Sequence, residues 1–401
     1  MLSRFPVLRP MLEPAWLVIL AGVCAALHMG KLPPALPILQ QELGISLLQS
    51  GFLLSLVQLA GMLFGIFIGL AADGIGQRRS MLIGLGVLAL SSLLGAGAQD
   101  AASLLRWRAL EGLGFLLVVL PAPNLIRLLV RPDQMNIMMG VWGTYMPLGT
   151  GLALLGGPAL MALAGWQGLW WGLSLFTVLV MVWLGLAVPP DDKLKSISQS
   201  GTTGWLHRLR QTLSASGPWL VALSFAVYSA QWLAVIGFLP TIYTQAGYSG
   251  ESTAILTAMV ALVNILGNLL AGVLLARAYR PHHLLYLGFL AMGLGTAFAF
   301  GGGSWGPTSR FISILLFSMI GGMVPATLFS LAVRLAPSDR TISTTVGWIQ
   351  QWSAMGQFLG PPLVAWVAAG VGGWHATWWV TCACSLVGLA LARLIARRLG
   401  G

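Results

Sequence analysis

Long stretches without a single Asp, Glu, Lys or Arg constrain this sequence more than any other feature. They include 43–72, 80–99, 136–190, 252–276, 281–309, 311–333 and 341–392. A helix needs about 20 predominantly apolar residues to cross a bilayer, and lipid forces every backbone polar group to be paired inside the protein. The sequence therefore predicts an all-α protein that crosses a membrane many times.

Twelve transmembrane helices fit this pattern. The stretches 136–190 and 341–392 are long enough for two crossings each, and we expect them to turn at Gly165–Gly168 and at Gly372–His375. The predicted spans are 15–37, 47–72, 80–98, 102–126, 136–164, 168–188, 217–244, 252–276, 284–302, 311–333, 341–370 and 375–393.

The composition excludes a soluble fold, because 57% of the 401 residues are hydrophobic and only 8% are charged, against about 25% charged residues in soluble domains. The net charge of +11 does not indicate nucleic-acid binding, since the basic residues are scattered singly between apolar runs. When the predicted spans are threaded back and forth, all but four of the 21 lysines and arginines lie on the side of the membrane that holds the N-terminus. The positive-inside rule then places both termini in the cytoplasm, as in a multi-pass protein of a bacterial-type inner membrane, in contact with membrane lipid.

The second half of the chain repeats the first at an offset near 205 residues. Gly140 and Gly149 recur with the same spacing as Gly347 and Gly356, and the Gly165-Trp166-x-x-x-Trp-Trp pattern recurs from Gly373. Repeated halves of this kind hold a solute site at their interface near the middle of the membrane. We therefore expect two pseudo-symmetric six-helix bundles, 1–188 and 217–401, joined by a cytoplasmic linker, 189–216.

The segment after the second span carries a spaced motif. It reads Gly69, three residues, Asp73-Gly74, one residue, Gly76, one residue, Arg78-Arg79. It resembles the signature between helices 2 and 3 of the major facilitator superfamily, with Gly74 where a basic residue is usual. The resemblance implies a twelve-helix fold with alternating access and a gating role for this segment. Glycines permit close contact, and Asp73 can cap a helix or pair with an arginine. A positive-inside loop alone would explain Arg78 and Arg79 but not the spacing.

Span seven and its exit extend the resemblance. Tyr228, Gln231 and Trp232 are followed by Gly237-Phe-Leu-Pro240, and span eleven contains Gly360-Pro361-Pro362. These residues resemble the cyanate and nitroimidazole transporter group of the superfamily. That group has an arginine in span one, nine residues before a proline, where this sequence has His28 before Pro37.

Ionisable residues inside spans are costly and are functional candidates. His28 and Lys31 lie three residues apart in span one, and so do Arg108 and Glu111 in span four. Two alternatives stay open here: Arg108 and Glu111 as a structural ion pair, and Lys31 extending to the outer interface. We predict proton coupling through His28 and Glu111. The predicted substrate-binding residues are Lys31, Arg108, Tyr228, Gln231, Trp232, Asn264, Gln351 and Trp352.

These residues favour a secondary active transporter for a small organic solute, with protons as coupling ion. We expect the solute to be anionic or weakly acidic, because no Asp or Glu lies within a second-half span. The alternatives are a proton-driven exporter of drugs or amphipathic metabolites, favoured by 17 Trp and 16 Met, and a receptor built on a transporter fold. The sequence has no metal-ligand spacing, phosphate-binding loop or hydrolytic triad, so no metal, cofactor or enzymatic activity is expected.

Overall fold

The computed structural model describes residues 14–131, 135–192, 205–301, 306–338 and 341–400, and every regular element within these ranges is a helix. The first half contains α2 (Pro14–Gly30), α3 (Leu32–Glu42), α4 (Leu47–Ser55), η2 (Leu56–Gln58), α5 (Leu59–Ile75), α6 (Gln77–Gly95), α7 (Ala101–Val119), α8 (Ala122–Leu129), α9 (Met135–Trp142) and α10 (Tyr145–Ala187). The second half contains α12 (Trp205–Ser214), α13 (Ser216–Gln245), α14 (Gly250–Ala276), α15 (Pro281–Phe300), α16 (Pro307–Gly321), α17 (Met323–Arg334), α18 (Ile342–Val371), η4 (Trp374–Ala376) and α19 (Trp378–Arg398).

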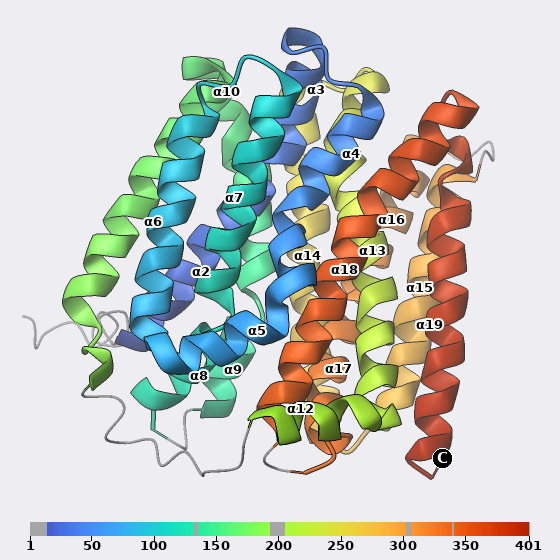
Figure 1. Cartoon of the computed structure of the whole chain (residues 1–401). Helices are drawn as coiled ribbons and strands as arrows, with labels where there is room; N and C mark the ends of the chain where they lie inside the picture. The colour runs from blue at the N-terminus through green and yellow to red at the C-terminus, as the bar shows by residue number, and fades with distance from the viewer. Residues whose placement is uncertain (1–13, 132–134, 193–204, 302–305, 339–340, 401) are drawn as a thin grey trace, which may run out of the picture.

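Eleven helical stretches of the described chain are long and apolar enough to cross a membrane. One of them, α10, has 43 residues, and its backbone is non-helical at Ala164 and Gly165. A straight helix of that length would measure about 65 Å, twice the thickness of a bilayer core. The chain instead folds back at Gly165, whose φ is +66°, so α10 supplies two crossings (Figure 1). The predicted twelve spans and both predicted turns are confirmed, the second at Gly372 with a left-handed backbone.

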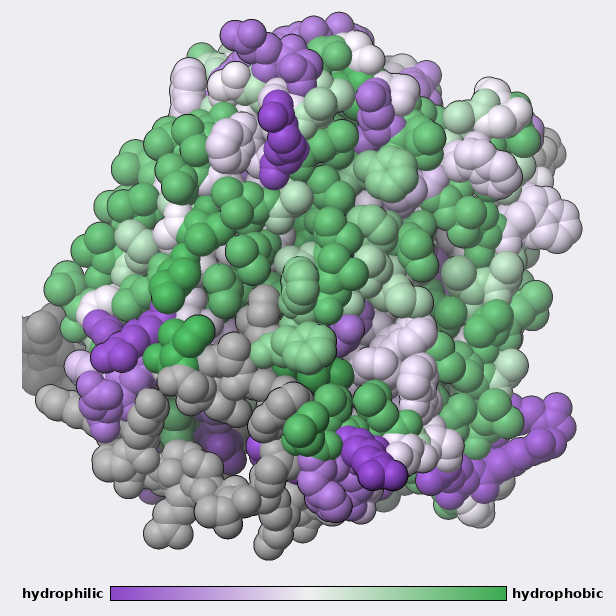
Figure 2. Space-filling view, viewed as in Figure 1, coloured by the Kyte–Doolittle hydropathy of each residue, from purple (hydrophilic) through white to green (hydrophobic). Residues whose placement is uncertain are grey.

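Most of the exposed large hydrophobic side chains lie on the sides of the helix bundle. Leu163 and Leu186 are more than four-fifths exposed at the surface of the protein, as lipid-facing side chains are. Figure 2 shows hydrophobic residues across the middle of this view, with hydrophilic residues gathered toward the two ends. This distribution is the one a multi-pass membrane protein requires.

The two bundles repeat individual side-chain contacts. Trp166 Nε1 donates to Glu42 Oε2 at 2.9 Å, and Trp374 Nε1 donates to Gln245 Oε1 at 2.8 Å. Each tryptophan follows the turn between the fifth and sixth spans of its half, and each acceptor ends the first span of its half. These equivalent bonds support the pseudo-symmetric fold, whereas the boundaries predicted for the two bundles and the linker stay a prediction.

One end of the molecule carries most of the arginines, and the bundles meet closely at the other. We call the end at which α6 begins and α8 and α19 terminate the arginine end (Figure 1); it carries Arg78, Arg79, Arg127, Arg397 and Arg398. At the opposite end α3 packs against α13, and α4 packs against α18. A Cβ placed on Gly51 would lie 2.8 Å from Pro362 Cα, and one on Gly237 would lie 2.8 Å from Leu54 Cδ1. The bundles are therefore closed together at the end opposite the arginines.

Candidate functional site

The four ionisable residues predicted from spans one and four meet in one buried cluster. His28 ends α2, Lys31 lies in the turn between α2 and α3, and Arg108 and Glu111 lie one turn apart on α7. None of the four is more than 3% exposed. The spacing of three residues on each helix brings both members of each pair to one face.

Glu111 is the centre of this cluster. Its Oε1 pairs with Lys31 Nζ, and its Oε2 accepts a bond of 2.8 Å from Arg108 Nη1. His28 Nδ1 lies 3.7 Å from Glu111 Oε1 and 3.5 Å from Lys31 Nζ. One carboxylate therefore serves two cations, and the His28 ring lies beside it.

The surrounding helices hold the remaining donors in place. Arg108 also donates to the backbone carbonyls of His28 at 2.6 Å, Leu53 at 3.1 Å and Met29 at 3.4 Å. These bonds tie α7 to α2 and α4, so Arg108 has a structural role as well as its charge.

Lys31 points into the interior of the first bundle. Its Nζ donates to Ser92 Oγ at 2.9 Å and lies 4.5 Å from the centre of the Trp170 ring. His28 Nε2 lies 2.8 Å from Thr177 Oγ1. Lys31 does not reach the interface as one alternative suggested, because its side chain is fully buried.

The formal charge of the cluster is +1 when His28 is neutral, because two cations face one carboxylate. Charges buried together interact more strongly than charges in water, and removal of one partner leaves the other uncompensated. The cluster is therefore a source of positive potential inside the first bundle.

A void lies between the bundles next to this cluster. It encloses about 400 Å³ including its open side. Its lining residues come from η2, α5, α7, α10 and α18: Gln58, Gly61, Gly65, Phe115, Leu116, Val119, Leu120, Tyr145, Met146, Gln350, Gln351, Ser353, Ala354 and Gln357. Gln58 Nε2 lies 3.7 Å from Met29 Sδ, and the Met29 carbonyl accepts from Arg108. Met29 thus contacts both a lining residue of the void and the charged cluster.

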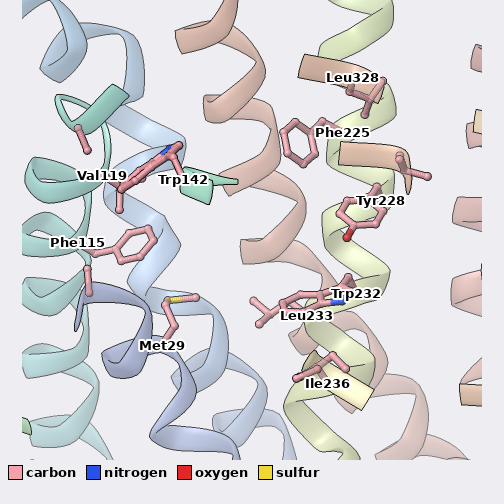
Figure 3. Packing of buried hydrophobic residues seen from close by; sticks show 14 of the residues in the cluster. Met29, Phe115, Val119, Trp142, Phe225, Tyr228, Trp232, Leu233, Ile236 and Leu328 are labelled. Atoms are coloured by element: carbon pink, nitrogen blue, oxygen red, sulfur yellow. The ribbon is translucent and has the colours of Figure 1, made fainter. Parts of the chain in front are cut away.

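Of the predicted substrate-binding residues, only Gln351 lines this void. In the second bundle, Tyr228 and Trp232 lie along α13 across from Met29 and Phe115 (Figure 3). The indole N–H of Trp232 is buried and has no partner in the structure.

The other predicted residues are engaged within the second bundle. Asn264 Nδ2 donates to Tyr228 Oη at 3.3 Å and to the Ser318 carbonyl at 2.9 Å. Gln231 Oε1 accepts from Ser385 at 3.0 Å, while its Nε2 is buried and unpaired. Trp352 packs against Trp219 with ring centres 5.4 Å apart.

Gln231 is the structural equivalent of His28. Each lies nine residues before a proline inside its helical run, Pro240 and Pro37. Each also bonds to a hydroxyl of its bundle's last span, Ser385 or Thr177. The second bundle thus has an uncharged amide where the first has an ionisable ring.

The predicted gating segment is described in part. The side chains of 68–74, which include Gly69 and Asp73, lie outside the described residues, so their roles stay a prediction. Gly76 has φ +107°, and a Cβ there would lie 2.4 Å from Asp191 Cγ. Asp191 Oδ1 and Oδ2 accept from the backbone amides of Arg78 and Arg79 at 2.9 and 3.0 Å. Asp191, which sequence reasoning assigned to the linker, therefore caps α6.

We expect Asp191→Ala to lower the free energy of unfolding by about 1–2 kcal/mol, because it removes a buried carboxylate from the first amides of α6. Asp192→Ala is the matched control. Its carboxylate is 76% exposed and lies 3.6 Å from an exposed Arg79, and such surface pairs contribute little. Thermal unfolding of the purified variants measures both changes. Equal losses in the two variants would show that the cap does not contribute as described.

Comparison with known proteins gives the class of this fold and site. The family model of the Major Facilitator Superfamily matches residues 18–360. The 4-hydroxybenzoate transporter PcaK of Pseudomonas aeruginosa is 27% identical over 393 residues, which cover 88% of this chain and 83% of the relative. The cyanate transport protein CynX of Escherichia coli is 25% identical over 325 residues, covering 80% of this chain and 79% of the relative.

The fold is also similar to that of a solved transporter structure. A bacterial homolog of the human lysosomal transporter Spinster, in its inward-facing and occupied conformation, superposes with a TM-score of 0.79 at 17% identity, covering 96% of both chains. Together the helical bundles and the relatives define a secondary active transporter of small organic solutes. The chain belongs to the Major Facilitator Superfamily.

Proposed function

We propose that this protein moves a small organic anion across a bacterial inner membrane by alternating access, coupled to a proton, with its arginine end in the cytoplasm. It would do so without a chemical step. The observation that carries the proposal is the buried cluster of Lys31, Arg108, Glu111 and His28, which holds a formal charge of +1 and is linked to the void through Met29.

The positive potential favours an anion over a cation in the void. Arg108 is occupied by three carbonyls and Glu111, so in this proposal it acts through its charge. Direct contacts with the solute fall to the amides of the void, which belong to Gln58, Gln350, Gln351 and Gln357. After residue 216 the sequence contains only Glu251 and Asp339 as acidic residues, so the second bundle offers few groups that would repel an anion.

Two of the relatives supply probes of suitable size. The names of PcaK and CynX give 4-hydroxybenzoate and cyanate as their solutes. Both solutes are small anions. Aromatic side chains at the void, Phe115 and Tyr145, favour the larger, aromatic probe through ring contacts.

The test is uptake of labelled 4-hydroxybenzoate and cyanate into proteoliposomes under an imposed pH gradient. Lys31→Met removes the excess charge and leaves the Arg108–Glu111 pair neutral, so we expect anion uptake to fall about ten-fold or more. Lys31→Arg keeps the charge and should retain most of the uptake. Wild-type uptake by Lys31→Met would overturn the assignment of an anionic substrate.

An exporter of amphipathic compounds is the second candidate, because Phe115, Tyr145 and Met146 give the void an adaptable apolar surface. A strain that lacks the gene separates the two functions. Hypersensitivity to many unrelated compounds supports export, and failure to grow on one solute supports uptake.

A further inference from the structure

The positive charge of the chain is distributed unequally between its two halves. Residues 1–192 contain nine lysines and arginines against eight acidic residues, whereas residues 193–401 contain twelve against two, Glu251 and Asp339. Almost the whole net charge of +11 therefore belongs to the second half. The positive-inside rule explains why basic residues gather at the arginine end, but it applies to both bundles and does not explain this difference.

The pairing of the arginines differs between the bundles as well. At the arginine end of the first bundle, Asp191 accepts from the backbone amides of Arg78 and Arg79, and Asp192 lies 3.6 Å from Arg79. At the same end of the second bundle, no arginine forms an ion pair with a carboxylate of the described residues. The cations of the second bundle are therefore open to an anionic partner from outside the chain.

The helix α12 presents one of these arginines beside an apolar side chain. Leu206 is more than half exposed, and Arg210, one turn further on, is exposed too, whereas Thr212 is fully buried. The chain enters α13 through the extended backbone of Ala215, so α12 lies across the arginine end of the second bundle (Figure 1). A helix that lies across the bundle with leucine and arginine on its open face is typical of the membrane–water interface.

Two further segments at this end have the same character. In the turn from α14 to α15, Tyr279 is more than half exposed between the exposed Arg277 and Arg280. Near the end of α19, Leu394 and Arg397 are both exposed. Tyrosine and arginine place their apolar parts against acyl chains and their polar tips at the level of the lipid headgroups. Both segments therefore suit the same interface as α12.

The three segments are neighbours in the fold. Arg398 donates to Ser216 Oγ, which joins the end of α19 to the start of α13, directly after α12. Because α15 packs along α19, the turn before α15 lies beside the end of α19. We call the exposed arginines of these segments the basic rim: Arg210, Arg277, Arg280, Arg393, Arg397 and Arg398.

We propose that the basic rim binds the headgroups of anionic phospholipids in the leaflet at the arginine end, and that the first bundle has no equivalent surface. Phosphodiester groups fit the rim because guanidinium groups bind phosphate oxygens well, while Leu206, Tyr279 and Leu394 contact the acyl chains. A soluble polyanion would pair with the arginines alone and leave these apolar side chains in water. The inference goes beyond the proposed transport function and does not depend on which solute is moved.

The first bundle provides a matched control. Arg127 and Arg131 are exposed at its arginine end, as Arg210 and Arg397 are in the second bundle. Changing either pair to glutamine removes two positive charges. A general effect of net charge on lipid binding would therefore be the same in both double variants, whereas binding at the rim would be lost in only one.

The test measures lipids bound to the purified full-length chain by native mass spectrometry, from mixed micelles with equal amounts of phosphatidylglycerol and phosphatidylcholine. We expect the wild type to retain phosphatidylglycerol preferentially. Arg210→Gln with Arg397→Gln should lower the ratio of bound phosphatidylglycerol to phosphatidylcholine about ten-fold, because each interfacial arginine attracts anionic headgroups. Arg127→Gln with Arg131→Gln should stay close to the wild-type ratio.

The absence of a preference in the wild type, or an equal loss in the two double variants, would overturn the proposal. Release of bound phosphatidylglycerol by an equal concentration of inorganic phosphate would also overturn it, because that result indicates a site for a free oxyanion. If the first rim variant does not fold, Arg277→Gln with Arg280→Gln repeats the test, and an unchanged ratio there would contradict the proposal. No transport is measured, so these outcomes are separate from those of the uptake experiment.

Discussion

Glu111→Gln should abolish transport and lower the free energy of unfolding by about 3–5 kcal/mol, because it removes one partner from a buried set of charges. Lys31 and Arg108 both bond to this carboxylate, and Lys31, Arg108 and Glu111 are at most 3% exposed. Glutamine has almost the same shape, so the loss would come from charge rather than from packing. Thermal unfolding followed by the fluorescence of the 17 tryptophans measures it.

A second substitution separates charge balance from function. Adding Lys31→Met to Glu111→Gln removes one of the two uncompensated cations, and Arg108 keeps its bonds to the carbonyls of His28, Leu53 and Met29. We expect the double variant to regain most of the stability and none of the transport. A single Glu111→Gln variant as stable as the wild type would contradict the ion pairing described for the cluster.

The number and approximate positions of the spans were predictable from the sequence for a simple physical reason. A charge inside lipid is so costly that charge-free runs coincide with helices, and the fold-back at Gly165 required a residue that tolerates positive φ. The repeat was also visible in the sequence, because both halves must turn and pack in the same way.

The reasons behind individual glycines were not predictable. Gly149 and Gly356 occupy equivalent places, and a Cβ there would lie 2.7 Å from Val23 O and 2.0 Å from Ala226 O respectively. Gly347 belongs to the same repeated pair but has nothing within 4 Å. Sequence identity between the halves marks positions that recur, whereas only the packing shows which of them need the absent side chain.

The charged cluster could be predicted in part. Spacing of three residues places His28 with Lys31 and Arg108 with Glu111, but it says nothing of which helix each pair faces. Helices that are apolar all round carry no amphipathic pattern to orient them. The same limit hid the hydrogen bonds of Gln58 to Gln357 and of Gln351 to the Met62 carbonyl. Asp191 gave no signal either, because nothing local distinguishes it from its neighbour Asp192.

His28→Gln should abolish solute accumulation driven by a pH gradient while leaving solute exchange intact. Gln231 shows that an amide at this place can bond to a hydroxyl of the last span, so the variant should keep the contact with Thr177 and the fold. The amide cannot take up a proton, whereas the His28 ring lies 3.7 Å from Glu111 and 3.5 Å from Lys31 and can change the charge of the cluster. His283→Gln, at an exposed position of α15, is the control and should transport as the wild type does.

The central claim is that a proton bound in the buried cluster drives the solute. Its most direct test compares two rates in the same proteoliposomes: accumulation of labelled 4-hydroxybenzoate under an imposed pH gradient, and its exchange against unlabelled solute with no gradient. We expect wild-type protein to show both, and His28→Gln to exchange at a similar rate while reaching only equal concentrations on the two sides. Accumulation by His28→Gln to the wild-type level would contradict the claim.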